Sequence, residues 1–139
     1  MHKLYTKIVI LFFTSTFSMS ASTSNTIRSE LITIVKQQQY LAKKISKNYV
    51  AFQADQKNSQ KKENMQNSIQ HFNDNHLKLI QYKNNTKLIN EKLSKVDKIW
   101  KIAHKLSQTK KHSVMIITAM NDISTKMKEL HDLYKQTSN

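Results

Sequence analysis

Residues 34–50, IVKQQQYLAKKISKNYV, decide the fold because their apolar side chains recur at helical spacing. The steps alternate between three and four residues, which places these side chains on one face of an α-helix. Three consecutive glutamines, Gln37, Gln38 and Gln39, interrupt the pattern, and Gln38 takes a place on the apolar stripe. The stretch therefore predicts an amphipathic helix that carries one amide group into its packed face.

Four such stripes follow one another beyond residue 25. We expect connections within residues 53–64, 82–87 and 107–113, with Thr86 and Ser113 as N-caps. Asparagines in the second connection tolerate a left-handed backbone, a role that glycine usually fills. Short connections between stripes of similar length predict an all-α, up-down-up-down antiparallel four-helix bundle. The stripes are Ile27, Leu31, Ile34, Gln38, Leu41, Ile45, Tyr49 and Phe52; Met65, Ile69, Phe72, His76 and Leu79, widened by Leu77 and Ile80; Ile89, Leu93, Val96, Trp100 and Ala103, with Leu106 beyond; and Ile116, Met120, Ile123, Met127, Leu130 and Tyr134.

The composition supports the same fold class and narrows the chemistry. The 139 residues include no glycine, proline or cysteine, so hairpin turns, disulfides and thiol nucleophiles are all disfavoured. The formal charge of +14 suggests an anionic partner or surface. Arg28 is the one arginine, however, and specific nucleic-acid readers rely on arginine, so no nucleic-acid partner is expected. A background of lysine, asparagine and isoleucine, as in an AT-rich genome, is the alternative source of the charge.

Residues 1–22 have the pattern of a secretory signal peptide. Lys3 and Lys7 precede an apolar run from Ile8 to Phe13, and small residues follow it. The run is shorter than the roughly 20 residues that span a bilayer, which favours cleavage over an uncleaved anchor. We therefore expect a domain at residues 23–139 that is periplasmic in a bacterium with two membranes and does not span the membrane. Loss of the two lysines lowers the formal charge from +14 to +12.

Three stretches resemble one sensor family: ITIVKQQQYLAKKISKNYV, FNDNHLKLIQYKNNTKLINEKLSKVDKIW and AMNDISTKMKELHDLY. They are similar to the type IV pilus methyl-accepting chemotaxis transducer N-terminal domain, a group that includes the nitrate and nitrite sensor domain of NarX-type histidine kinases. The resemblance covers residues 27–135 and implies a four-helix sensor bundle. In nitrate-sensing members an arginine of the first helix grips the anion near the axis between two protomers.

The placement of that signature on this chain implies a binding site on the first helix. Gln38 matches the family glutamine, whereas Gln39 stands where the arginine is found. An amide donates hydrogen bonds to an anion but carries no charge, so its grip on nitrate is weaker. The ligand-binding residues implied are Gln38, Gln39 and Lys43. The alternative is a buried Gln38 satisfied by a facing polar residue such as His76, which would fix the helix register.

Catalytic and metal chemistry find little support in the sequence. No nucleophile–base pair, paired carboxylates or phosphate-binding loop stands out, so an enzyme is not expected and no cofactor is implied. Met127 and His131, four residues apart, could together hold copper. Methionine on an apolar stripe is ordinarily a core residue, and no metal site is therefore predicted.

The sequence leaves three hypotheses open. The leading hypothesis is a periplasmic, non-catalytic sensor-like module. It would bind a small polar or anionic ligand within the bundle or across a homodimer axis, and would act through a partner such as a membrane receptor. The alternative is a cationic interaction protein that binds acidic partners or envelope polyanions, with weaker binding at high salt. A purely structural bundle without a ligand is the third possibility.

Overall fold

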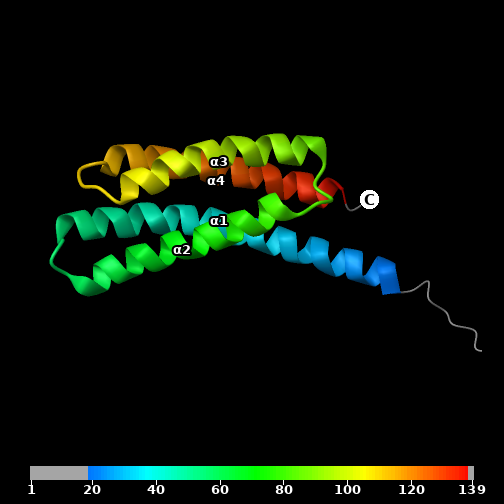
Figure 1. Cartoon of the computed structure of the whole chain (residues 1–139), viewed down its shortest axis with the longest axis horizontal. Coiled ribbons are helices and arrows are strands. Elements are labelled where there is room, and N and C mark those ends of the chain that lie inside the picture. The colour runs from blue at the N-terminus through cyan, green and yellow to red at the C-terminus, as the bar shows by residue number, and fades with distance from the viewer. Residues whose placement is uncertain (1–18, 138–139) are drawn as a thin grey trace, which may run out of the picture.

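The computed structural model describes the backbone of residues 19–137 and the side chains of residues 23–137. It confirms the predicted all-α four-helix bundle (Figure 1). The helices are α1 (Met19–Ala54), α2 (Ser59–Gln81), α3 (Lys87–Ser107) and α4 (Ser113–Gln136). The apolar run of the predicted signal peptide lies outside the described residues. Within the described part, no helix is long and apolar enough to cross a membrane.

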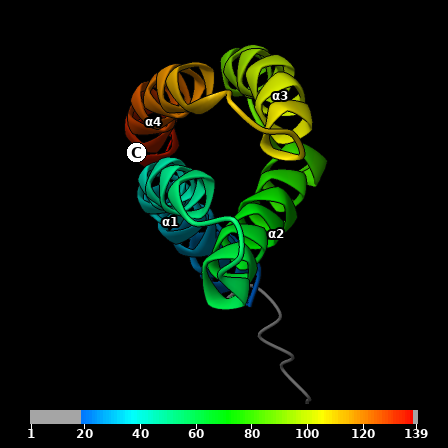
Figure 2. The same ribbon diagram turned by 90° about the vertical axis from the view of Figure 1, so that its left-hand side faces the viewer.

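The helices form a closed ring when viewed along the bundle (Figure 2). Helix α1 packs against both α2 and α4, α3 packs against α4, and the contact between α2 and α3 is the smallest. Both the α1–α2 and the α3–α4 connections lie at one end (Figure 1). At the other end the N-terminal part of α1 extends past the α2–α3 connection and the end of α4.

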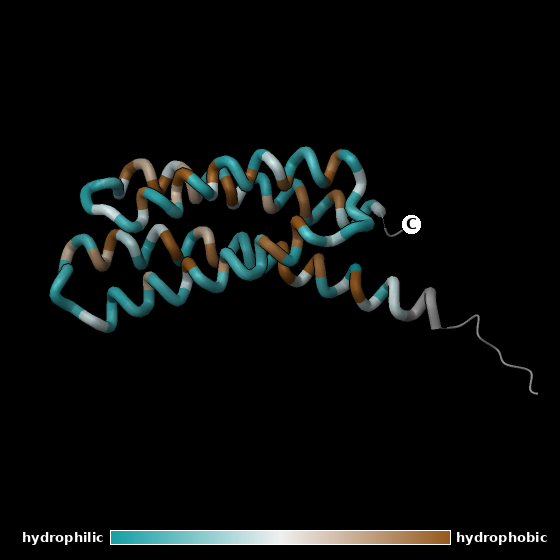
Figure 3. The backbone as a smooth tube through the Cα atoms, viewed as in Figure 1, coloured by the Kyte–Doolittle hydropathy of each residue, from teal (hydrophilic) through white to brown (hydrophobic). Residues whose placement is uncertain are grey.

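The core consists of the predicted stripes apart from Ile27, which is 37% exposed, and Figure 3 shows apolar segments recurring along the helices. Two predictions about its width are wrong, because Leu77 and Ile80 are 44% and 39% exposed. Helix α2 makes only a small contact with α3, and Ile80 lines an open pocket against α3 instead of packing into the core. In contrast, Val35 and Ala42 of α1 are fully buried although neither belongs to the predicted stripe. Helix α1 touches two neighbours, so its buried face is wider than a single stripe.

The connections are shorter than the polar stretches of the sequence. The first contains only residues 55–58, because α2 begins at Ser59 and the side chain of Asn58 caps it by accepting from the Lys61 N–H at 3.0 Å. Thr86 caps α3 as predicted, since its Oγ1 accepts from the Ile89 N–H at 3.2 Å. A polar residue one position before a helix can thus supply the missing acceptor for its first turn.

The α3–α4 connection departs from the prediction at its cap. Ser113 is already the first residue of α4, and the preceding His112 makes no side-chain cap bond. A positive φ of 67° falls on Lys111 of this connection, whereas a left-handed residue was expected among the asparagines of the α2–α3 connection. Instead of a cap, the Tyr49 hydroxyl of α1 donates to Thr109 O at 2.7 Å and accepts from the His112 N–H at 3.1 Å. A side chain from a distant helix therefore holds this turn.

Candidate functional site

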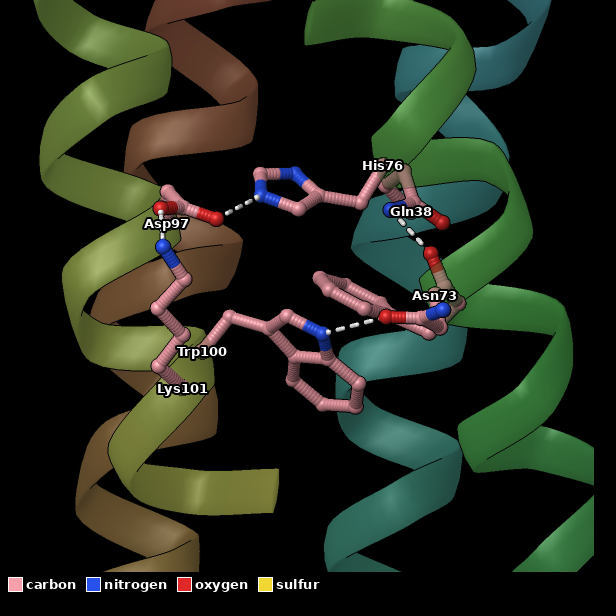
Figure 4. Close-up of polar contacts among 7 residues, drawn as sticks. Gln38, Asn73, His76, Asp97, Trp100 and Lys101 are labelled. Atoms are coloured by element: carbon pink, nitrogen blue, oxygen red, sulfur yellow. Dashed lines mark hydrogen bonds and ion pairs between the residues drawn. The ribbon is translucent and has the colours of Figure 1, made fainter. Parts of the chain in front are cut away.

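Gln38 points into the bundle and is fully buried, as its place on the stripe predicts. Its Nε2 donates to the backbone oxygen of Phe72 on α2 at 3.0 Å (Figure 4). Its Oε1 is buried and has no hydrogen-bond partner among the described residues. The Phe72 oxygen lies inside α2 and already accepts the helical bond, so Gln38 adds a second bond to it. The amide joins α1 to α2 at mid-bundle.

The other two predicted binding residues do not join Gln38. Gln39 is half-buried and Lys43 is exposed. Gln37, also exposed, reaches α2 on the outside of the bundle, where its Oε1 accepts from Asn75 Nδ2 at 3.2 Å. Of the three glutamines, Gln37 is therefore exposed, Gln38 lies in the core and Gln39 lies at the border between the two. Nothing in this arrangement gathers Gln38, Gln39 and Lys43 around one ligand.

His76, the facing residue considered as a partner of Gln38, pairs with a different helix. Its Nε2 lies 3.2 Å from Asp97 Oδ1 on α3, and the second oxygen of Asp97 lies 2.6 Å from Lys101 Nζ (Figure 4). His76 is buried, whereas Asp97 is half-buried and Lys101 is exposed. The chain of contacts runs from the core of α2 to the surface of α3. It crosses the interface where these two helices have the least contact.

Burial and charge set the ionisation of this pair in a definite way. Burial lowers the pKa of His76 despite the hydrogen bond and the negative charge of Asp97, which act in the opposite direction. For Asp97, partial burial raises the pKa, but hydrogen bonds from Lys101 and His76 lower it more. The pair is therefore a neutral imidazole donating from Nε2–H to a carboxylate. The Nδ1 of His76 is buried without a partner among the described residues.

Trp100 and Asn73 make a parallel link one turn away between α3 and α2. The indole Nε1–H donates to Asn73 Oδ1 at 3.1 Å (Figure 4). The Trp100 ring also packs on Phe72, with 4.3 Å between the centroids, and stacks on His104 at 5.3 Å. The buried ring of His76 also stacks on Phe72, with 6.1 Å between the centroids. This mid-bundle cluster is suited to fixing the register of three helices.

Replacement of Gln38 by leucine tests whether its amide is needed for folding. We expect Gln38→Leu to raise the free energy of unfolding by about 1 kcal/mol, because it removes a buried unpaired oxygen and leaves Phe72 O in its helical bond. Urea titration followed by circular dichroism measures the change. The matched control, Gln39→Leu at the half-buried neighbouring position, should stay within about 0.5 kcal/mol of the parent. A loss of stability in Gln38→Leu would show instead that the amide is required to align α1 with α2.

A second feature, at the overhanging end of α1, is a cavity of about 140 Å³ that contains the one arginine of the chain. We call it the Arg28 cavity. On the same kind of measure a single water needs roughly 10–15 Å³, so the cavity has room for a small ligand. The N-terminal part of α1, the α2–α3 connection, the start of α3 and the end of α4 contribute its lining residues: Ser24, Arg28, Leu31, Tyr82, Asn84, Thr86, Ile89, Tyr134 and Thr137.

The electrostatics of the Arg28 cavity favour an anion. Its lining includes one cation, several hydroxyl groups, one amide side chain and no acidic residue. No ion pair joins Arg28 to any residue whose side chain is described. The lining also includes the cap and first turn of α3, where unpaired N–H groups give a helix its positive end, and no acidic side chain offsets it there.

One wall of the Arg28 cavity is held firmly. The Tyr134 hydroxyl donates to Asn85 Oδ1 at 2.7 Å, and Asn85 Nδ2 donates to Leu79 O at 2.8 Å. Burial raises the pKa of Tyr134, so this hydroxyl stays protonated at neutral pH. The α2–α3 connection is thereby tied to the end of α4. Tyr82 and Asn84, in contrast, form no side-chain hydrogen bond with other described residues, which leaves their donors free for a ligand.

The sequence marks Arg28 only as an isolated arginine, and no site was predicted around it. A lone arginine on the first helix, one turn before the stripe residue Leu31, was the available clue.

The side chains of residues 23–137 include no group of three or more His, Asp or Glu residues that could hold a metal ion. Comparison of the chain with protein-family models, curated proteins and solved structures found no match.

Proposed function

We propose that this protein is a non-catalytic binding module for a small anion, of the kind implied by the resemblance to periplasmic sensor bundles. The observation that carries the proposal is the Arg28 cavity, in which an arginine without an ion pair among the described residues faces uncharged donors. A planar guanidinium binds nitrate or a carboxylate through two parallel hydrogen bonds. The ligand class is therefore a small inorganic or monocarboxylate anion.

The proposed site differs from the one implied by the family signature. Gln39 stands at the signature arginine position, and Arg28 lies eleven residues earlier on the same helix, about 16 Å along its axis. In this proposal Arg28 supplies the positive charge that Gln39 lacks, from a position three turns nearer the N-terminus of the same helix. In this proposal Gln38 contributes to the bundle and not to ligand contact. Export to the periplasm and transmission of the signal through a partner protein complete the proposed role.

Replacement of Arg28 tests the ligand site directly. Chloride in the buffer is replaced stepwise by nitrate, nitrite, formate or acetate at constant ionic strength, and two-dimensional NMR spectra of the protein follow the backbone amides. We expect saturable shifts around residues 82–89 with one of these anions. Arg28→Gln should weaken that binding about tenfold or more, because it removes a charge-assisted hydrogen bond of about 1.4 kcal/mol or above.

Two control variants show whether the ligand binds in the Arg28 cavity or elsewhere. Lys43→Gln removes an exposed lysine of the same helix from outside the cavity and should leave the affinity unchanged. Gln38→Leu should also leave it unchanged. If Gln38→Leu abolishes binding and Arg28→Gln does not, the ligand lies at mid-bundle and the Arg28 cavity is not the site. If none of the anions shifts any amide, the proposed function fails.

A further inference from the structure

A groove with an apolar floor runs between α3 and α4, near the end that holds the 108–112 connection. We call it the α3–α4 groove; its volume is about 340 Å³ and its lining includes Ile99, Ile102, Val114, Met115 and Ala119. Val114 is 78% exposed, Ile102 60% and Met115 54%. Exposed apolar side chains gathered into one patch are typical of protein interaction sites and binding grooves.

Four lysines neighbour the groove-lining residues along the chain. Lys98 and Lys105 lie on α3 one turn to either side of Ile102, and Lys110 and Lys111 lie in the connection that leads to α4. All four lysines are exposed, and none forms an ion pair with a described residue. The one acidic residue that lines the groove, Asp122, is already paired with Lys126 at 3.1 Å. The surface therefore presents an apolar strip with uncompensated positive charge on its border.

We infer that the α3–α4 groove binds an acidic amphipathic helix of a partner protein. A helix laid in a groove buries an apolar stripe spaced three and four residues apart and directs its other faces toward the rim. Glutamate or aspartate flanking that stripe would meet the four unpaired lysines. A second copy of this chain fits the groove poorly, because it would set one lysine rim against another on molecules with a formal charge of +14 each.

This inference does not rest on the proposed anion site. The Arg28 cavity is formed by the α2–α3 connection and the overhang of α1, whereas the α3–α4 groove lies toward the opposite end of the bundle (Figure 1). The inferred binding of an acidic helix specifies which kind of acidic partner the positive charge would attract. The groove adds what charge alone lacks, namely an apolar strip that selects a helix with its apolar residues on one face.

The test uses synthetic peptides of about five helical turns as probes. The first has leucines on one face and glutamates on the others. The second has the same composition with the leucines distributed around the helix, and the third replaces every glutamate of the first by lysine. Isothermal titration gives the affinities, and methyl NMR of isoleucine, valine and methionine locates the binding. We expect the first peptide to bind the protein at least tenfold more tightly than the second and to shift Ile102, Val114 and Met115, while the third does not bind.

Variants on the exposed surface separate the groove from general charge attraction without risk to the core. The double substitution Ile102→Ser with Met115→Ser should weaken the binding of the first peptide at least tenfold. Lys98→Gln with Lys105→Gln should weaken it several-fold at low salt. Leu88→Ser, at another exposed apolar residue near the opposite end of α3, should have no effect. The inference would be overturned if the first two peptides bound equally well. It would also be overturned if Ile102→Ser with Met115→Ser left the binding of the first peptide unchanged. Dimerisation of the free protein that these serines abolish, or binding to anionic lipid vesicles in preference to the peptide, would overturn it as well.

Discussion

Trp100→Ala should lower the free energy of unfolding by about 3–5 kcal/mol, the largest effect we expect from any single substitution considered for this protein. Trp100 is buried, its ring lies 4.3 Å from that of Phe72, and its indole N–H is bonded to Asn73. The substitution therefore removes a large buried ring, leaves a cavity and deprives a polar side chain of its partner. Domains of this size are stable by about 5–15 kcal/mol, so a large part of the total is at stake.

The same position offers a control that separates packing from hydrogen bonding. Trp100→Phe keeps an aromatic ring against Phe72 but loses the bond to Asn73, and we expect a loss of about 1–2 kcal/mol. Urea titrations of the three proteins should be followed by far-ultraviolet circular dichroism, because the chain has a single tryptophan and the variants lack its fluorescence. A loss below about 1 kcal/mol in Trp100→Ala would contradict the role of this ring as the contact between α2 and α3.

The importance of this ring follows from the uneven contacts of the bundle. Helices α2 and α3 touch each other less than the other neighbouring pairs do. At mid-bundle they are joined by two polar links from side chain to side chain, Trp100 to Asn73 and His76 to Asp97. Where apolar contact is limited, each such link contributes a larger share of the interface. Among the buried polar residues, His76 bridges α2 and α3, whereas Gln38 and Asn75 join α2 to α1.

The bundle was predictable from the sequence because every helix carries its apolar residues at helical spacing. The stripe Ile89, Leu93, Val96, Trp100 and Ala103 is buried throughout, and the fourth stripe is buried without exception. Gln38 likewise points inward because of its place in the pattern. Its acceptor could not be foreseen, since the Phe72 carbonyl is a backbone atom and carries no mark in the sequence. Periodicity predicts which face is buried, but not which atom it meets.

The cavity and the groove depend on how far the helices slide past each other. The Arg28 cavity exists because α1 overhangs the α2–α3 connection, and no local pattern encodes that offset. The turn at Lys111 depends on the Tyr49 hydroxyl, about sixty residues earlier in the chain, so the predicted cap at Ser113 was unnecessary. For the α3–α4 groove the sequence did hold a clue, because Ile102, Val114 and Met115 are apolar residues off the predicted stripes.

Acidification below about pH 6.5 should destabilise the protein, and His76 should be the cause. The pKa of His76 is lowered by burial in the folded state, whereas in the unfolded chain it has the ordinary value of 6.5. Between the two values the unfolded chain binds a proton that the folded protein does not, so stability falls as the pH falls. One such group gives a slope of up to about 1.4 kcal/mol per pH unit between its unfolded and folded pKa values.

Asp97 acts in a lower pH window and can be told apart from His76. Its pKa is lowered from 3.8, so the stability it contributes is complete above about pH 4 and is lost as the pH falls through its folded value. Glu129, an exposed carboxylate whose pKa is lowered by Lys92, also titrates below its ordinary value of 4.5. Between pH 4.5 and 6.5 the acid-induced loss therefore belongs to the buried imidazole.

Urea titrations at intervals from pH 7.5 to 4.5 would measure this slope, with His76→Gln as the decisive variant. Glutamine can still reach toward Asp97 with an N–H donor but does not titrate, so the variant should lose the slope between pH 6.5 and 5. The exposed His104, replaced in His104→Gln, serves as the matched control and should retain it. Asp97→Asn removes the negative charge that favours the imidazolium, so the pKa of His76 should fall further and the slope should extend to lower pH. A parent protein with flat stability between pH 6.5 and 5 would mean that the folded state accepts the proton as readily as the unfolded chain, and that the imidazole is not enclosed as the packing against Phe72 implies.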